Sequence, residues 1–433
     1  MSELLSPAGS LKAMRYAFAY GADAVYAGQP RYSLRVRNNE FSHENLVKGI
    51  KEAHAQGKKF FVASNVLAHD DKVKTYLRDL KPVVAAGPDA LIVADPGLIM
   101  MIRETWPEMD VHLSVQANVT NSAQVKFWQK MGLTRIILSR ELSLKEIAKI
   151  RDACPDIELE VFVHGALCMA YSGRCLLSGY FNHRDSNQGA CTNACRWKYR
   201  VHAGKEDASG NVVPDSPVDD AAKETSAFLV EDVTRPGKFM PIEEDEQGTQ
   251  IFNSKDLRAI QHIDALIKMG IDCLKIEGRT KSFFYAARIT QLYRQAIDDA
   301  NAGKPFDLGL MDALEGFSTR GYTEGFYRRH VPSEYQRYEE KTPDQASQQF
   351  IGEIVSYDPD KKQAQVCVKN HFEVGDDLEI MLPSGNQRMI LSSMQNEKGH
   401  AMPIAPGSGY TVSIPLTCEP EAARFGLVIK HKA

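Results

Sequence analysis

The stretch YGADAVYAG (residues 20–28) contains the pattern from which the fold of this chain can be predicted. A glycine that can end a helix comes first, and a short run of apolar and β-branched residues that suits a buried strand follows it. The same order recurs along the chain in AGPDALIVAD (86–95), MGLTRIILSR (131–140) and MGIDCLKIEG (269–278). A repeated helix-to-strand unit predicts an α/β fold built on a parallel sheet.

Further strand candidates lie between these phrases, and amphipathic stretches separate them. They are ELLSPAG (3–9), KKFFVASNV (58–66), DVHLSVQAN (110–118) and ELEVFVHGA (158–166). One amphipathic stretch opens with Ser143 and Glu146 at the spacing of a helix-capping box. Eight strand–helix units within roughly 300 residues predict a closed (β/α)8, TIM-like barrel. The alternative is an open doubly wound sheet, but no GxGxxG motif follows the first strand.

The chain is expected to contain two domains. We assign residues 1–335 to the barrel, with an insertion at 168–253 after the seventh strand, and residues 346–433 to a small all-β domain. The insertion begins with a cysteine-rich part and continues with an acidic part that Pro and Gly interrupt. Loops this long are usually functional or disordered. The short apolar runs and turns of the last segment suggest a small C-terminal β-barrel domain.

Composition and charge set limits on the location and partners of the protein. Of its 433 residues, 43% are hydrophobic and 25% are charged, which is ordinary for a soluble globular protein. The N-terminus lacks the pattern of a signal peptide, and no apolar run is long enough to span a membrane, so a cytoplasmic protein without a membrane partner is expected. The net charge of −4 means that nucleic-acid binding would need a local basic face.

Active sites of (β/α)8 barrels lie at the C-terminal ends of the strands. The polar residues predicted to end there and to bind substrate are Tyr26, Asn65, Gln116, Asn118, Arg140, Lys275 and Arg279. The arginines and the lysine suit an anion such as a carboxylate or phosphate. His164 and Glu277 are the candidate catalytic residues. The alternatives are ion pairing among the charged groups and a hydrogen-bonded core position for His164.

A cluster of four cysteines opens the predicted insertion, directly after the seventh strand. They are Cys168, Cys175, Cys191 and Cys195, with six, fifteen and three residues between them. Clustered cysteines in a reducing compartment more often bind metal or do chemistry than form disulfides. Four thiolates suit zinc or an iron–sulfur cluster, and the loose spacing of the first pair favours iron–sulfur. Zinc and a nucleophilic cysteine remain alternatives.

The stretch EVFVHGALCMAYSGRCLLS (160–178) resembles the signature of the collagenase-like peptidase family U32. The likeness extends over nearly the whole chain, through ELLSPAGSLKAMRYAFAYGADAVYAG (3–28), DCLKIEGRTKS (272–282) and RGYTEGFYRRH (320–330). Within this family the chain is most similar to members that hydroxylate tRNA. The resemblance therefore implies an RNA-modifying oxidoreductase more than a peptidase, and no HExxH or GxSxG motif supports proteolysis.

The resemblance also implies particular cofactors and partners. It implies a [4Fe-4S] cluster on the four cysteines, prephenate as co-substrate, and hydroxylation of the wobble uridine 34 to 5-hydroxyuridine in the anticodon loop of tRNA. Prephenate is a dicarboxylate, which suits the predicted Arg and Lys groups. The segment RRH (328–330) is the candidate for contacts with tRNA phosphates. An unknown electron-transfer partner is possible. The rival is a non-catalytic subunit that binds tRNA or prephenate.

Overall fold

The computed structural model describes residues 1–34, 39–167, 171–172, 174–175, 178, 186–189, 255–317, 321–328 and 347–432. Within the acidic segment it describes the backbone of five short strands. These are β8 (Gly204–Glu206), β9 (Val212–Pro214), β10 (Phe228–Glu231), β11 (Phe239–Asp245) and β12 (Gly248–Gln250). Strand β8 pairs with β9, and β10, β11 and β12 form a second antiparallel sheet.

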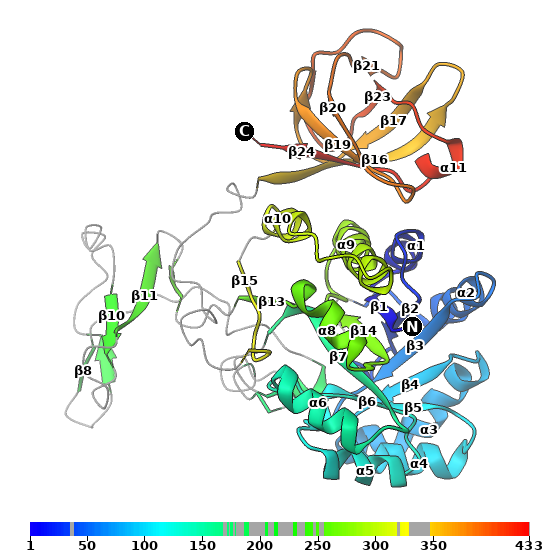
Figure 1. Ribbon diagram of the computed structural model, residues 1–433, viewed down its shortest axis with the longest axis vertical. Coiled ribbons are helices and arrows are strands. Elements are labelled where there is room, and N and C mark those ends of the chain that lie inside the picture. Colours follow the sequence, from blue (N-terminus) through cyan, green and yellow to red (C-terminus); the bar gives the residue numbers. More distant parts are fainter. Residues whose placement is uncertain are drawn as a thin grey trace.

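Eight parallel strands form a closed barrel (Figure 1). They are β1 (Glu3–Pro7), β2 (Ala24–Gly28), β3 (Lys59–Ser64), β4 (Ala90–Val93), β5 (Val111–Leu113), β6 (Arg135–Ile137), β7 (Glu158–Ala166) and β14 (Cys273–Ile276). Each strand pairs with the next in parallel register, and β14 pairs with both β7 and β1. At Cys273 the two closing pairs meet, because this residue is opposite Glu160 on one side and Glu3 on the other. The predicted TIM-like barrel is confirmed, and the open sheet is excluded.

Helices alternate with the strands and surround the barrel. They are α1 (Leu11–Ala19), α2 (His43–His54), α3 (Asp70–Ala85), α4 (Pro96–Thr105), α5 (Ser122–Lys130), α6 (Leu144–Ala153), α8 (Ile263–Lys268), α9 (Phe283–Asn301) and α10 (Gly309–Glu315), with short 3-10 turns at η2 (Val115–Ala117), η3 (Ser186–Gln188) and η5 (Ile260–His262). The predicted capping box of Ser143 and Glu146 starts α6. In the part of the chain that the structure describes, no helix is both long and apolar enough to cross a membrane.

The glycines of the four repeated phrases have the conformation that their role requires. Gly21, Gly87, Gly132 and Gly270 have φ values of 99°, 72°, 82° and 80°. This left-handed region is strained for residues with a Cβ, and glycine adopts it freely at the end of a helix. The repeat read in the sequence is therefore the physical signal that ends each helix and turns the chain toward the next strand.

The end of β7 carries two strands that the sequence pattern did not predict. Strand β13 (Asp256–Arg258) pairs antiparallel with β7, with Leu257 opposite Gly165 and Arg258 opposite His164. Strand β15 (Tyr322–Thr323) then pairs with β13. Strands β13 and β15 extend the sheet beyond the barrel strands. His164, near the end of β7, therefore packs against tyrosines from both α9 and β15.

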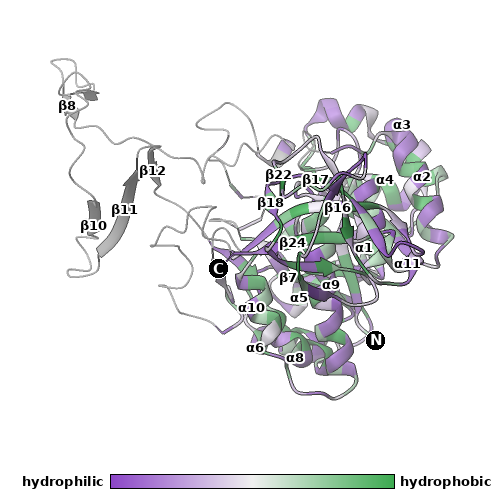
Figure 2. Cartoon of the chain, turned by 90° about the horizontal axis from the view of Figure 1, so that it is seen from above, coloured by the Kyte–Doolittle hydropathy of each residue, from purple (hydrophilic) through white to green (hydrophobic). Residues whose placement is uncertain are grey.

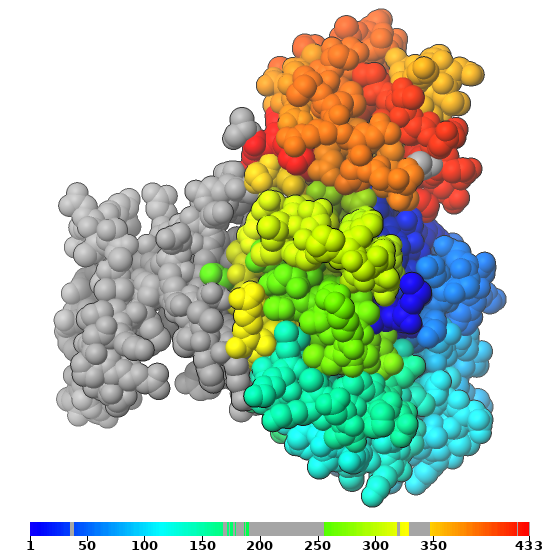
Figure 3. Space-filling view, viewed as in Figure 1, coloured from blue at the N-terminus to red at the C-terminus, as the bar shows by residue number. Residues whose placement is uncertain are grey.

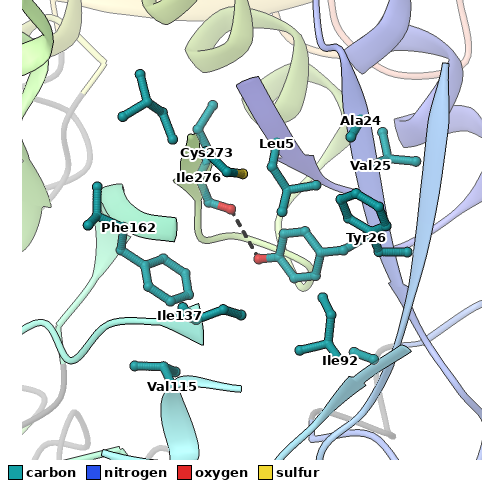
Figure 4. Packing of buried hydrophobic residues seen from close by; sticks show 14 of the residues in the cluster. Leu5, Ala24, Val25, Tyr26, Ile92, Val115, Ile137, Phe162, Cys273 and Ile276 are labelled. Carbon is teal, nitrogen blue, oxygen red and sulfur yellow. Dashed lines mark hydrogen bonds between the residues drawn. The ribbon is translucent and has the colours of Figure 1, made fainter. Parts of the chain in front are cut away.

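Buried apolar residues from all eight strands and the surrounding helices form one core. Figure 2 shows that hydrophilic and hydrophobic residues alternate along the helices that surround the barrel. Leu5, Ile92, Ile137 and Phe162 meet near the ring of Tyr26 (Figure 4). All are at most 5% exposed. Burial of side chains of this size contributes about 1.5–3 kcal/mol each. The barrel interior is therefore packed with side chains and is not an open channel.

An antiparallel sheet forms the C-terminal domain. Its strands run in the order β20 (Gln387–Ile390), β19 (Asp377–Met381), β24 (Leu427–His431), β16 (Gln348–Asp358), β17 (Gln363–Val368), β23 (Thr411–Pro415) and β21 (Gln395–Asn396). The domain also contains the strand pair β18 (Phe372–Glu373) and β22 (Ile404–Ala405) and the short helix α11 (Pro420–Ala423). The sequence pattern predicted five of these strands. It missed β24, which lies at the centre of the sheet between β19 and β16.

The C-terminal domain packs directly on helices α1 and α9 of the barrel (Figures 1 and 3). Tyr16, Tyr20 and Phe284 of these helices form an apolar cluster with Met381 and Leu427 of the sheet. Tyr20 Oη also donates a hydrogen bond to the carbonyl of Met381 at 2.9 Å. The contact combines buried apolar surface with satisfied polar groups, which is typical of a stable interface.

We expect the substitution Arg288→Met to weaken this domain contact by about 2–3 kcal/mol, because a charged hydrogen bond is worth about 1.5–3 kcal/mol. Arg288, only 3% exposed, contacts both carboxylate oxygens of Glu379 at 2.8 and 3.3 Å. Burial opposes ionisation of Glu379, but the charge of Arg288 and hydrogen bonds from His431 and Arg288 lower the pKa of this carboxyl. Denaturant unfolding measures the loss. The contribution of Glu379 should also decrease as the pH falls through its lowered pKa. An unchanged midpoint would contradict the assignment.

Candidate functional site

The ends of β2, β6 and β14 place Tyr26, Arg140 and Glu277 together at the barrel mouth. Tyr26 Oη donates to the carbonyl of Ile276 at 3.0 Å (Figure 4) and to Glu277 Oε2 at 3.1 Å. Arg140 Nη2 lies 3.9 Å from the same Glu277 oxygen. Burial, and then the nearby carboxylate, raises the pKa of Tyr26 well above its usual value, so its hydroxyl stays a donor. The mouth thus holds an ordered carboxylate beside a guanidinium.

The guanidinium of Arg140 is held flat against the rim. It stacks on the ring of Phe162, with Cζ 3.7 Å from the ring centroid, and its Nη1 donates to Ser172 Oγ at 3.2 Å. The sequence analysis did not identify Phe162 as part of the site. The sequence does contain a signal for Phe162. Residues two apart on a strand share a face, so Phe162 and Glu160 are expected on the same face of β7.

Arg279 reaches the mouth from the segment after β14. Its Nη2 donates to the carbonyl of Leu34 at 2.6 Å, and its guanidinium lies 5.7 Å from the Tyr26 ring centroid. A Cβ at Gly28 would lie only 2.4 Å from Arg279 Nη1, so this close approach requires glycine at the end of β2. Arg140 therefore lies beside Glu277, and Arg279 lies beside Tyr26.

Lys275 is buried and forms an ion pair inside the barrel. Its ammonium donates to Glu160 Oε1 at 2.6 Å, and the two residues are 3% and 0% exposed. Glu160 is also 3.4 Å from Arg135 Nη1, and Arg135 binds Glu3 at 2.7 Å. Lys275 is thus part of a buried ion network within the barrel. Its ammonium also lies 4.4 Å from the centroid of the Tyr26 ring. The assignment of Lys275 to substrate binding stays a prediction, and the structure adds the internal ion pair with Glu160.

His164 lies apart from the other candidates. Its ring packs against Tyr285, Tyr293 and Tyr322, and its Nδ1 is 3.3 Å from Tyr293 Oη. Burial, with smaller effects from nearby cations, lowers the pKa of His164 to about 3. Such a group is a poor proton acceptor near neutral pH. The placement supports the alternative reading, a hydrogen-bonded core histidine, over a catalytic role.

The predicted amide residues line the rim between β3 and β6. Asn65 Oδ1 accepts a hydrogen bond from the Leu34 backbone N–H at 3.1 Å, and its Nδ2 donates to Ser114 Oγ at 3.2 Å. Asn118 has a φ of 54° and donates to the carbonyls of Gln116 and Ser172 at 3.0 and 2.7 Å. In the described part of the chain, Gln116 Oε1 and Asn118 Oδ1 are buried acceptors without a hydrogen-bond donor. A bound ligand or water is the usual partner of such atoms.

The cysteine-bearing segment lies against this rim. Ser172 is fixed to Asn118 and Arg140, as described above. Farther along the segment, the Gln188 side chain donates a hydrogen bond to the Leu67 carbonyl. The backbone carbonyl of Gln188 accepts a hydrogen bond from Lys72 Nζ at 3.1 Å. Between these anchors, the carbonyl of Cys175 accepts a hydrogen bond from Ser186 Oγ at 2.6 Å. Of the described residues after β7, Ser172 and Gln188 therefore contact the C-terminal side of the barrel.

The donor chemistry of this segment fits an iron–sulfur cluster, because four thiolates are the usual ligand set. Cys175 is half-buried at the barrel mouth, which suits a thiolate ligand shielded from solvent. The predicted ligands Cys168, Cys191 and Cys195 lie outside the described residues. The predicted phosphate-binding segment is described only at Arg328, whose Nε is 2.7 Å from Glu324 Oε2.

The fold and the mouth define a TIM-like barrel protein with an arginine- and carboxylate-bearing site under a cysteine-containing segment. Residues 9–337 match the model for peptidase family U32, and residues 346–427 match the model for the peptidase family U32 C-terminal domain. The chain belongs to peptidase family U32.

Several characterised relatives in this family act on RNA. The chain is 63% identical to tRNA hydroxylation protein P of Escherichia coli K12, over 96% of this chain and 93% of the relative. It is 57% identical to tRNA hydroxylation protein P of Haemophilus influenzae, over 95% of this chain and 92% of the relative. It is also 31% identical to a 23S rRNA 5-hydroxycytidine synthase of Escherichia coli, over 88% of this chain but about half (52%) of that relative.

Proposed function

We propose that this protein hydroxylates tRNA, and that its product is 5-hydroxyuridine at wobble position 34. The observation that carries the proposal is the 63% identity, over nearly the full length of both chains, to tRNA hydroxylation protein P. The likeness to an rRNA 5-hydroxycytidine synthase supports the same class of reaction, because both products carry a hydroxyl group on a pyrimidine ring. An anticodon-loop base suits a site at a barrel mouth, since it is already unpaired and leaves its stack at low cost.

We propose that prephenate binds at the mouth between Arg140 and Arg279. A guanidinium presents a planar fork of donors that matches a carboxylate, and prephenate has two carboxylates. Arg140 follows β6 and lies 3.9 Å from Glu277, and Arg279 follows β14 and lies 5.7 Å from the Tyr26 ring centroid. The buried acceptors Gln116 Oε1 and Asn118 Oδ1 suit a hydroxyl or amide N–H of a bound ligand.

In this proposal Glu277 is the base that accepts the proton leaving C5 of the uracil ring. Replacing the hydrogen on C5 of the uracil ring by a hydroxyl is a two-electron oxidation. An external oxidant must accept the two electrons, water or that oxidant must supply the oxygen atom, and a base must take the proton that leaves C5. Glu277 is the carboxylate at the mouth, and Tyr26 Oη holds it in place at 3.1 Å. Arg140 Nη2 lies 3.9 Å from the same carboxylate oxygen. A [4Fe-4S] cluster on Cys168, Cys175, Cys191 and Cys195 would supply electron transfer when bound.

Mass spectrometry of tRNA nucleosides tests this proposal. We expect 5-hydroxyuridine and nucleosides derived from it to disappear from a strain without the gene, and to return when a plasmid supplies the gene. A strain that has the gene but cannot make prephenate should show the same loss, and added prephenate should reverse it. A complementing Glu277→Gln variant, matched in shape but not basic, should fail to restore the product. Unchanged wobble uridines in the deletion strain would contradict the function, and recovery without prephenate would contradict the co-substrate.

A further inference from the structure

A single turn of the cysteine-bearing segment is fixed to the barrel and yet exposes two side chains. The turn runs from Tyr171 to Arg174, and the Arg174 N–H donates to the Tyr171 carbonyl at 3.0 Å. Ser172, between them, is only 7% exposed. Ser172 is thus held at the mouth, while the side chains of Tyr171 and Arg174 are exposed.

The anchor of this turn is made by residues from two barrel loops. Asn118 Nδ2 donates to the Ser172 carbonyl at 2.7 Å, and Arg140 Nη1 donates to Ser172 Oγ at 3.2 Å. Asn118 holds this position with a left-handed backbone (φ 54°), which Asn tolerates better than most residues. A constrained turn costs little further entropy when it binds a ligand.

The exposed side chains form an aromatic and cationic pair. Tyr171 is 49% exposed, among the largest exposures of an aromatic residue in the described part of the chain, and Arg174 is also exposed. Cys175, the next residue, is half-buried. An exposed aromatic ring on a backbone anchored at the barrel mouth suits a flat, apolar partner.

We propose that the Tyr171–Arg174 turn is the RNA platform of this protein: the Tyr171 ring stacks on an unpaired nucleobase, and the Arg174 guanidinium contacts an adjacent phosphate. Single-stranded RNA is recognised in this way, by bases stacked on aromatic side chains with cationic groups along the backbone. A protein partner could also cover the ring. It would not explain why the turn is anchored next to Arg140 and Glu277, where the substrate base is proposed to react. The inference rests on the proposed function, and it adds the residues that hold the substrate loop.

Binding of a short RNA hairpin to the intact, cluster-containing protein tests the platform. One hairpin has the anticodon stem and loop, and a second has the same stem closed by a compact tetraloop. We expect Tyr171→Ala to weaken binding of the anticodon hairpin by about 5- to 100-fold, and Tyr171→Phe to retain most of it, because stacking needs the ring and not the hydroxyl. Arg174→Gln should lower the slope of log affinity against log salt by about 0.7, the value for one phosphate contact on a single strand.

Matched controls lie on the C-terminal domain. Tyr410, at 46%, is as exposed as Tyr171, and Arg388 is an exposed arginine paired with Asp377. Tyr410→Ala and Arg388→Gln should leave the affinity and the salt slope unchanged. Iron content is measured in every variant and should stay at the level of the unaltered protein.

The outcomes separate this inference from the proposed function. If the unaltered protein binds neither hairpin, the proposed tRNA substrate is wrong. If it prefers the anticodon hairpin and Tyr171→Ala binds as tightly, the platform is wrong and the function stands. Equal losses in Tyr171→Ala and Tyr410→Ala would also overturn the platform. So would a fall in iron content in Tyr171→Ala, because the turn would then support the cluster and not the RNA.

Discussion

Replacing Cys175 by Ala is expected to reduce RNA hydroxylation at least about 100-fold while the barrel stays folded. Changes beside a metal site already cost about 10- to 100-fold in affinity or activity, and loss of a ligand should cost more. Cys175 lies in the segment over the barrel mouth, outside the apolar core of the barrel. Its removal should therefore change the free energy of unfolding by less than about 1 kcal/mol. Iron and sulfide analysis, visible absorption and hydroxylation of tRNA by the purified variant measure the effect.

A second cysteine gives the control for this experiment. Cys367 is also half-buried but lies on β17 of the C-terminal domain. Cys367→Ala should keep its iron, its absorption and its activity. The proposal that Cys175 is a cluster ligand is wrong if the Cys175→Ala protein retains full iron and sulfide. Zinc in place of iron in the unaltered, anaerobically purified protein would rule out the redox role.

Replacing Lys275 by Met is expected to destabilise the barrel by about 3–5 kcal/mol, because it leaves a buried carboxylate without its main partner. Glu160 is 0% exposed, and its Oε1 lies 2.6 Å from Lys275 Nζ. Its Oε2 lies 3.4 Å from Arg135 Nη1, which also forms an ion pair with Glu3. Methionine has a similar length, so the change removes the charge with little loss of packing. Denaturant unfolding followed by circular dichroism measures the difference.

The size of this effect distinguishes an internal ion pair from a substrate contact. Lys268→Met provides the control, because Lys268 forms an exposed i,i+4 pair with Asp264 and exposed pairs are worth at most about 1 kcal/mol. The double variant Glu160→Gln with Lys275→Met should recover much of the lost stability, since no buried charge is left alone. A Lys275→Met protein of normal stability that binds prephenate poorly would instead support the predicted role of Lys275 in substrate binding.

Several features of the site follow from sequence position alone. Tyr26 within β2 and the residues after β6 and β14 lie toward one rim, because all eight strands run in parallel and end at the same side. Tyr26, Arg140, Glu277 and Arg279 are there for this reason. Ser172 and Cys175 follow β7 closely along the chain, so they had to emerge at the same rim.

The departures from expectation concern which way a side chain points. Lys275 and Glu277 are two residues apart in one phrase, yet Lys275 pairs with Glu160 inside the barrel and Glu277 lies at its mouth. The pairing of β14 with β7 shifts register between Lys275 and Ile276, which a sequence pattern does not reveal. His164 is at the end of β7, but β13 and β15 pair beside it and enclose it among tyrosines.

The sequence by itself determined the barrel, because a glycine that ends each helix and an apolar run that forms each strand are local signals, set by backbone sterics and burial. It also determined which segments end at the mouth, since parallel strands leave no other choice. Only the tertiary structure decided which charges meet there. Ion pairs such as Lys275 with Glu160 join residues 115 positions apart, and a carboxylate pairs with whichever cation the closed barrel brings within a few ångströms of it.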